Sequence, residues 1–280
     1  MQPLGKSATD AAMDPRQRIM LVGSTGSGKT AQIWTLPGKK FVFAFDPNTL
    51  PTLKGCPDCT YEEFFPEYME VDTALKGFNK GSRSDTMKKK REPRLYERWR
   101  DYFNDFVDQE YHKQFDWLVF DSMTFVAKAM MDRQLYINNR YGDIEELGDF
   151  RVVGSKLTDV FSSISGLPVN IFATGHTRVF EDDKTKRIVT QIFLPGKARD
   201  ILPLTSTNVW EAYSEEGKNG QEYKVRTVPD RRGLQDIRSS IQGLAPIEDV
   251  TIKDFAHATK YGIGALLKRS EVNAIHKRTA

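Results

Sequence analysis

The residues with the clearest capacity for chemistry form one short loop near the start of the chain. Residues 23–30 read Gly-Ser-Thr-Gly-Ser-Gly-Lys-Thr and satisfy the pattern Gly-x-x-x-x-Gly-Lys-[Ser/Thr]. Glycines in such a loop let backbone N–H groups converge on phosphate oxygens, and a following helix turns its positive N-terminal end to the same place. The loop is therefore predicted to bind nucleotide phosphates through Gly23, Ser24, Thr25, Gly26, Ser27, Gly28, Lys29 and Thr30.

Lys29 and Thr30 have separate expected roles, and a third residue joins them. The Lys29 ammonium can reach the β- and γ-phosphates, whereas the Thr30 hydroxyl can ligate Mg²⁺. Asp121 ends the apolar segment 115–120 and is predicted to hold Mg²⁺ beside Thr30. The alternative is that Asp121 only ends a strand. The pattern predicts ATP and Mg²⁺ as cofactors, with Lys29 and Asp121 as catalytic residues.

A strand, a helix and neighbouring strands must position these residues. Apolar residues 18–22 precede the loop, and residues 29–36 are compatible with a helix that Pro37-Gly38 stops. Further strands are predicted at 40–45, 67–72, 115–120 and 169–173, and helices from residue 93, at 123–139 and at 151–164. After residue 177 period-two hairpin strands follow, at 188–193, 208–213 and 221–227. The pattern predicts an α/β fold: a mostly parallel sheet flanked by helices, late antiparallel strands and a C-terminal helical extension.

The domain boundaries follow from changes in composition along the chain. Residues 1–15 are expected to be a flexible leader, 16–245 one domain with a basic, helical insertion at 76–112, and 246–280 the helical extension. The net charge of +3 means that affinity for nucleic acid must come from local clusters. No apolar run reaches the about 20 residues that a membrane helix needs, so no membrane partner is expected.

The two cysteines, Cys56 and Cys59, exclude a disulfide scaffold and favour a reducing compartment. Their C-x-x-C spacing lacks the two further ligands of a zinc site, so they are interpreted as two reduced thiols.

Four segments together resemble RecA-like cores, most closely the phage-encoded single-strand annealing ATPases of the ATP-binding branch of the Sak family, also described as AAA-type proteins. These segments are residues 23–30, 115–122, 169–176 and 194–203. The resemblance spans residues 17–230, and only the first segment is highly specific. Ser122 supports it, because AAA+ motors usually carry a catalytic Glu directly after the aspartate and recombinase-type cores usually carry Ser.

The resemblance implies a function and partners. It implies an ATP-binding and ATP-hydrolysing protein that binds single-stranded DNA and promotes annealing in phage recombination. It further implies a homo-oligomeric ring or filament, a single-strand-binding protein as a further partner, and the cytoplasm of a bacterial host. The alternative is a nucleotide-dependent remodelling or loading ATPase that acts on a protein. A small-molecule kinase is disfavoured, because the basic segment 76–100 is Lys-led and precedes Asp121.

The resemblance also assigns residues around the γ-phosphate. In such cores the strand after the acidic one ends in a polar residue that senses this phosphate, and His176 holds that place; the alternative is a structural histidine. Relatives often carry a catalytic Glu after the second strand, where this chain has Asn48, and an amide cannot abstract a proton. Three alternatives stay open: Asp46 is the base, a carboxylate such as Glu70 is, or hydrolysis is slow and ATP acts as a switch.

Basic residues suggest contacts outside the nucleotide site. RecA-like cores carry a DNA-binding loop after the sensor strand, where this chain has Arg178, Lys184, Lys186 and Arg187; the alternative is a plain hairpin turn. The segment 76–100, with Phe78, Tyr96 and Trp99 as stacking groups, either contacts DNA or is only solvated. Lys197 and Arg199 follow a Pro-Gly turn expected to project both outward, toward a neighbouring subunit's γ-phosphate or simply into solvent.

Overall fold

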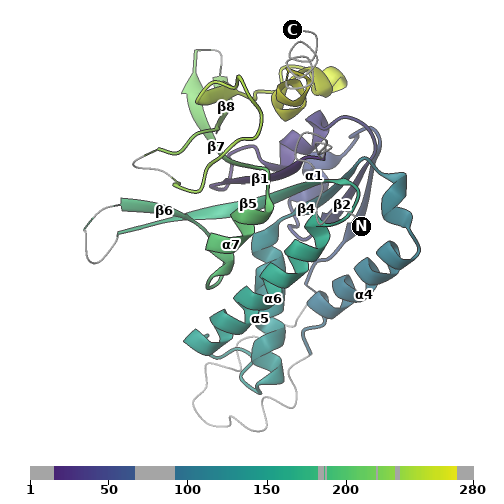
Figure 1. Cartoon of the computed structure of the whole chain (residues 1–280), viewed down its shortest axis with the longest axis vertical. Coiled ribbons are helices and arrows are strands. Elements are labelled where there is room, and N and C mark those ends of the chain that lie inside the picture. The colour runs from purple at the N-terminus through teal and green to yellow at the C-terminus, as the bar shows by residue number, and fades with distance from the viewer. Residues whose placement is uncertain are drawn as a thin grey trace, which may run out of the picture.

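The computed structural model describes residues 16–66, 92–181, 186, 188–218, 220–230 and 234–269, and within these the strands form one nine-stranded sheet (Figure 1). The strands are β1 (Arg18–Gly23), β2 (Lys40–Ala44), β3 (Cys59–Glu63), β4 (Trp117–Asp121), β5 (Asn170–Glu181), β6 (Ile188–Ile192), β7 (Asn208–Gly217), β8 (Gly220–Arg226) and β9 (Ile247–Asp249).

The strand order is β3-β2-β4-β5-β1-β7-β8-β9, and β6 pairs only with β5. Strands β3 to β7 of this order are parallel to one another, whereas β8, β9 and β6 pair antiparallel. This topology confirms the predicted fold class, a RecA-like P-loop core with a mostly parallel sheet and late antiparallel strands. Because the carboxyl ends of parallel strands meet at one edge, the ends of β1, β2, β4 and β5 converge there.

Helices cover both faces of the sheet. The first face is covered by α4 (Leu95–Asp108), α5 (Met123–Ile137), α6 (Leu147–Ser165) and α7 (Ala198–Thr205). The second is covered by the 3₁₀ helix η2 (Thr30–Thr35), α1 (Thr49–Leu53) and the helical residues 262–269, with the 3₁₀ helix η5 (Phe255–Lys260) beside η2. A further 3₁₀ turn, η4 (Tyr111–Gln114), precedes β4.

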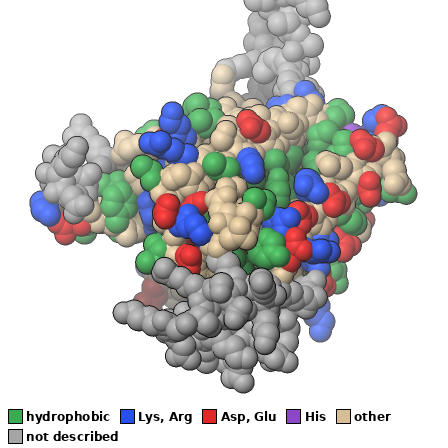
Figure 2. Space-filling view, turned by 90° about the horizontal axis from the view of Figure 1, so that it is seen from below, with side chains coloured by type: hydrophobic (Ala, Val, Ile, Leu, Met, Phe, Trp, Pro, Cys, Tyr) green, Lys and Arg blue, Asp and Glu red, His purple; other side chains and the backbone are tan. Residues whose placement is uncertain are grey.

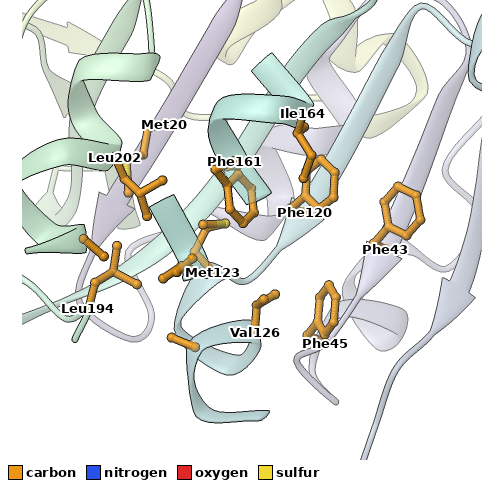
Figure 3. Close-up of a cluster of buried hydrophobic side chains, with 14 of the residues drawn as sticks. Met20, Phe43, Phe45, Phe120, Met123, Val126, Phe161, Ile164, Leu194 and Leu202 are labelled. Atoms are coloured by element: carbon orange, nitrogen blue, oxygen red, sulfur yellow. The ribbon is translucent and has the colours of Figure 1, made fainter. Parts of the chain in front are cut away.

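Successive side chains of each central strand point to opposite faces of the sheet and so belong alternately to the two cores. In β1, Met20 and Val22 belong to the core under α4–α7, and Ile19 and Leu21 belong to the opposite core. Figure 3 shows the first core, where Phe120 lies between Phe161 and Phe43. Phe43 and Phe120 are stacked with ring centroids 4.9 Å apart. Burial on both faces explains why these strands are continuous apolar runs.

The predicted helix from residue 93 is α4, and its aromatic residues belong to the core. Trp99 is 2% exposed and its ring lies 5.6 Å from that of Phe45, edge to face. Tyr96 is partly buried and packs against Trp99. The expectation that Trp99 stacks on bases is therefore wrong, because its indole is used to join α4 to the sheet. Phe78 lies outside the described residues.

Other predicted elements differ in extent or place. The strand expected at 67–72, like Glu70, lies outside the described residues, whereas the edge strand β3 at Cys59–Glu63 was missed, because its sequence is mostly polar and its side chains are mostly exposed. The segment after the phosphate loop is 3₁₀ and not α, because three β-branched residues and Pro37-Gly38 restrict it to six residues. β5 continues to Glu181, beyond the expected end at Ala173, because its distal half pairs with β6.

The C-terminal extension is bound closely to the helix that follows the phosphate loop. β9 joins the main sheet, and Gln32 of η2 donates to Val250 O at 2.9 Å and accepts from Ile263 N at 3.0 Å. Gly264 N donates to Thr35 Oγ1 at 3.1 Å, and a Cβ on Gly264 would lie 1.9 Å from Thr35 O. These hydrogen bonds from the C-terminal extension therefore hold η2 in place.

This contact predicts a strong effect of one methyl group. Gly264→Ala should lower the free energy of unfolding by about 3 kcal/mol, because the backbone of η2 must move to make room. Gly148→Ala is the matched control, since a Cβ there meets nothing within 4 Å and a helical alanine stabilises by up to about 1 kcal/mol. Urea unfolding measures both, and equal stabilities of the two variants would contradict the close contact.

Candidate functional site

The phosphate loop joins β1 to η2 and encloses the Lys29 ammonium. Gly26 and Gly28 have φ values of 80° and 82°, which side chains other than glycine rarely adopt. Lys29 Nζ donates to Gly23 O at 3.0 Å, Ser24 O at 2.7 Å and Ser27 Oγ at 3.2 Å. The loop therefore curls around its own lysine and holds the charge at the carboxyl end of β1.

Burial changes the protonation behaviour of Lys29. The residue is 7% exposed, and desolvation lowers its pKa from 10.5 to about 8, against the opposing charges of Asp121 and Asp46. The ammonium is thus only weakly hydrated, so a phosphate placed in the loop would interact with it more strongly than with a surface lysine.

Asp121 is buried at the end of β4 and accepts hydrogen bonds from three threonines. Oδ2 accepts from Thr30 Oγ1 at 3.0 Å and from Thr49 Oγ1 at 2.6 Å, and Oδ1 accepts from Thr174 Oγ1. Burial raises the pKa of Asp121 above its ordinary value, and the three hydroxyl donors offset only part of this rise. The threonines come from η2, α1 and β5, so the carboxylate joins three separate segments.

The donor set around Asp121 fits a hard cation such as Mg²⁺. A hydroxyl and a carboxylate lie 3.0 Å apart at the base of the phosphate loop, and oxygen ligands of this kind are those that Mg²⁺ prefers. Ser122 Oγ, which is buried beside Asp121, has no hydrogen-bond partner and can accept or donate to a further ligand. The described residues contain no group of three or more His, Cys, Asp or Glu that could hold a metal.

His176 lies beside the phosphate loop, within a strand and not at its end. It is the last β5 residue paired with β1, opposite Gly23. Its backbone N–H donates to Thr124 Oγ1 at 3.0 Å, and burial together with the Lys29 charge lowers its pKa. The imidazole is therefore kept in its neutral form near Lys29, although its role as a sensor stays a prediction.

Asp46 lies close enough to the site for its charge to act on Lys29, Asp121 and His176. Its Oδ1 accepts from Asn48 N at 2.9 Å and from Asn48 Nδ2 at 3.0 Å. Its backbone N–H donates to Asp121 O at 3.1 Å. The asparagine that replaces the expected glutamate thus orients a neighbouring carboxylate.

Three residues of the site were missed by sequence reasoning. Thr49 and Thr174 bind Asp121, and the Tyr223 ring lies against Gly28, where an added Cβ would meet Cδ1 at 2.6 Å. Thr174 could have been predicted from the sequence, because it directly follows the apolar strand predicted at 169–173. The carboxyl end of that strand lies beside the end of the strand that carries Asp121. No sequence pattern indicated Thr49 or Tyr223, since their positions depend on how distant segments pack.

The candidates for contacts in trans and with DNA lie away from this cluster. Lys197 is exposed at the start of α7, whereas Arg199 bonds within its own chain, to Gly196 O at 3.0 Å and Gln191 Oε1 at 2.9 Å. The expectation that both point outward is wrong for Arg199, because α7 turns it back onto β6. Arg178 is exposed on β5, Lys186 pairs with Glu181 at 3.6 Å, and Lys184 and Arg187 lie outside the described residues.

Comparison with known proteins places this arrangement in a family. The family described as "AAA domain" matches residues 15–233, which include the phosphate loop, Asp121 and His176. The chain belongs to the AAA domain family. No curated protein sequence matches significantly. The AAA domain is similar in structure to the flagellar accessory protein FlaH from Methanocaldococcus jannaschii, with 10% identity, 85% of this chain and 87% of that chain covered, and a TM-score of 0.35.

Membership of this family implies that the AAA domain uses a nucleotide and, typically, Mg²⁺. Among the described residues, no helix is both long enough and apolar enough to cross a membrane.

The lowered pKa of Lys29 predicts how nucleotide affinity depends on pH. Lys29 is charged below about pH 8 and loses its proton above it, so ATP affinity should be constant up to pH 8 and then fall by about tenfold per pH unit. Calorimetric titrations from pH 6.5 to 9.5 measure this. Lys29→Ala and Lys29→Arg should show no such fall, because neither side chain titrates in this range; a parallel fall in both would assign the effect to another group.

The threonine bonds predict a metal-dependent effect. Thr174→Val keeps the shape but removes one donor to Asp121, which should weaken Mg²⁺–ATP binding by about tenfold, the value of one hydrogen bond to a charged group. Binding in EDTA should change far less, because Asp121 acts through the metal. The control is Thr158→Val, whose hydroxyl donates to Gly154 O at 2.8 Å in α6. Equal losses with and without Mg²⁺ would contradict the assignment of Asp121 to the metal.

Proposed function

We propose that this AAA domain binds Mg²⁺–ATP between the phosphate loop and Asp121 and hydrolyses it slowly. One observation carries the proposal: Thr30, the last residue of the loop, donates to the buried Asp121 carboxylate at 3.0 Å, beside the desolvated Lys29. A phosphate-binding loop and a metal-binding carboxylate thus meet at one edge of the sheet, as phosphoryl transfer requires.

Each residue of the site has a separate proposed role in binding and hydrolysing ATP. Backbone N–H groups of residues 23–30 bind the phosphates, Lys29 neutralises charge on the β- and γ-phosphates, and Thr30 with Asp121 holds the metal. Mg²⁺ supplies charge neutralisation and orientation of the phosphates when it is bound. Asp46 accepts the proton of the attacking water, oriented by Asn48. Hydrolysis is slow because Asp46 acts without the carboxylate that relatives carry at the position of Asn48.

We propose that nucleotide binding is transmitted along β5 to single-stranded DNA. Thr174, His176 and Arg178 alternate along β5 and therefore lie on one side of the strand. Thr174 bonds to Asp121, His176 faces Gly23, and Arg178 belongs to the two-stranded ribbon that β5 forms with β6, which extends away from the sheet in Figure 1. A change at the phosphates can thus reach the ribbon through a single strand.

The ribbon offers groups that suit a single strand of DNA. The exposed Arg178 guanidinium lies 5.5 Å from the ring centroid of Phe180 and 5.8 Å from that of Phe193. Such clusters combine a phosphate-binding charge with stacking surfaces for bases. This supports the proposed activity, ATP-dependent annealing of single strands of the phage recombination type, by a homo-oligomer in which the exposed Lys197 reaches the neighbouring site.

A second candidate, an ATPase that acts on a protein, is favoured by the opposite side of the ribbon. Val179 and Ile188 are 65% and 71% exposed there, and exposed apolar side chains suit a protein surface better than a nucleic acid. On the described part of the face in Figure 2, basic and acidic side chains are interspersed and do not form one basic patch.

The deciding experiment measures ATP hydrolysis with and without single-stranded DNA. Lys29→Ala should abolish turnover while leaving thermal unfolding unchanged, and parent activity in this variant would overturn the ATPase assignment. DNA should stimulate the parent, and Arg178→Ala should lower both stimulation and the salt dependence of binding. Val179→Thr, on the other side of the ribbon, is the matched control. Absence of stimulation, or an effect of Val179→Thr alone, would favour the protein-directed candidate.

A further inference from the structure

Cys56 and Cys59 form a thiol pair in the turn that leads from α1 to β3. Cys56 N donates to Leu53 O at 2.8 Å, which closes the end of α1, and Asp58 has a φ of 52°, which reverses the chain. The reversal returns Cys59 to the side of Cys56, close enough for each thiol to shift the pKa of the other, and Cys56 Sγ also lies 3.8 Å from Pro57 O. Both thiols are free and partly exposed.

A buried positive charge lies beside this pair. Lys40 is paired with Cys59 in the register of β2 and β3 and is 2% exposed. Its ammonium donates to Leu36 O at 3.1 Å and to Gly38 O at 2.9 Å, and within the described residues no carboxylate forms an ion pair with it. Lys40 therefore favours the thiolate form of both cysteines.

The two thiols are not equivalent. The hydrogen bond from Cys59 and the charge of Lys40 lower the pKa of Cys56, against burial and Asp58. The same hydrogen bond and burial raise the pKa of Cys59. Cys56 is thus the thiol that ionises more readily, and Cys59 keeps its proton to a higher pH. This asymmetry is what a stepwise thiol–disulfide exchange requires.

We propose that Cys56 and Cys59 are a dithiol site that exchanges with small-molecule disulfides and closes to an intramolecular disulfide, with Cys56 attacking first. The Cys56 thiolate attacks one sulfur of a disulfide RSSR, forms a mixed disulfide and expels RS⁻. Cys59 then gives up its proton, attacks Cys56 Sγ and expels the second RS⁻. The two cysteines lose two electrons and two protons, and RSSR becomes two RSH.

A metal is the less suitable ligand for this pair. The described residues offer no third His, Cys, Asp or Glu within reach of the two sulfurs, and a structural zinc site needs four ligands. The proposal is also independent of the nucleotide site, because among the described residues no hydrogen bond joins either cysteine to the phosphate loop or to Asp121.

The test exposes the folded protein to oxidised glutathione and follows its mass. The parent should lose two hydrogen atoms and retain no glutathione, and reduced dithiothreitol should reverse the change. Cys59→Ser should stop at a glutathione adduct on Cys56. Cys56→Ser should form its adduct about tenfold more slowly, because Cys59 contributes little thiolate.

Two controls keep the result interpretable. Substoichiometric iodoacetamide on the parent should alkylate Cys56 before Cys59, and this preference should vanish in urea, where the fold no longer distinguishes them. Lys29→Ala should close the disulfide as the parent does, which separates this proposal from the ATPase assignment. Equal reactivity of the two cysteines in the folded parent, persistent adducts on both, or no reaction with glutathione would each overturn the dithiol site.

Discussion

Asp121 ends the central strand β4 with a carboxylate that is 2% exposed, and hydroxyls from Thr30, Thr49 and Thr174 donate to it. A buried carboxylate without such donors costs several kcal/mol, so these bonds must form together for β4 to keep its charge there. The three donors belong to η2, α1 and β5. The phosphate loop, the segment after β2 and the strand that leads to the ribbon are thereby fixed relative to one another.

The sheet makes this convergence possible. β4 lies between β2 and β5, and β5 lies between β4 and β1, so the ends of four parallel strands meet around one carboxylate. Separate apolar cores on the two faces hold the strands in register, and the C-terminal extension supports η2 from the second face. The negative charges of Asp121 and Asp46 partly offset the effect of desolvation on Lys29.

Local sequence patterns predicted those parts of the site whose residues all lie in one continuous segment of the chain. The phosphate loop is such a segment, and so is an apolar strand that ends in Asp121. Thr49 shows why the rest could not be predicted: it binds Asp121 only because β2 pairs with β4 in one register. Arg199 shows the converse, because its spacing suggested a free cation, whereas the fold gives it a partner in Gln191.

The fold class followed from the alternation of strands and helices, but β5 was predicted too short, and its extra length changes how the site is understood. β5 pairs with β4 up to Ala173 and with β1 up to His176, and from Thr177 onward it pairs with β6. β5 is therefore held by both neighbours up to Ala173 and by β1 alone up to His176, which lies beside the phosphate loop and whose backbone N–H donates to Thr124 Oγ1 of α5. A two-stranded ribbon twists more readily than a strand inside a sheet. The ribbon begins one residue after His176, the residue that is paired with Gly23, so the more easily twisted part of β5 starts directly beside the phosphate loop.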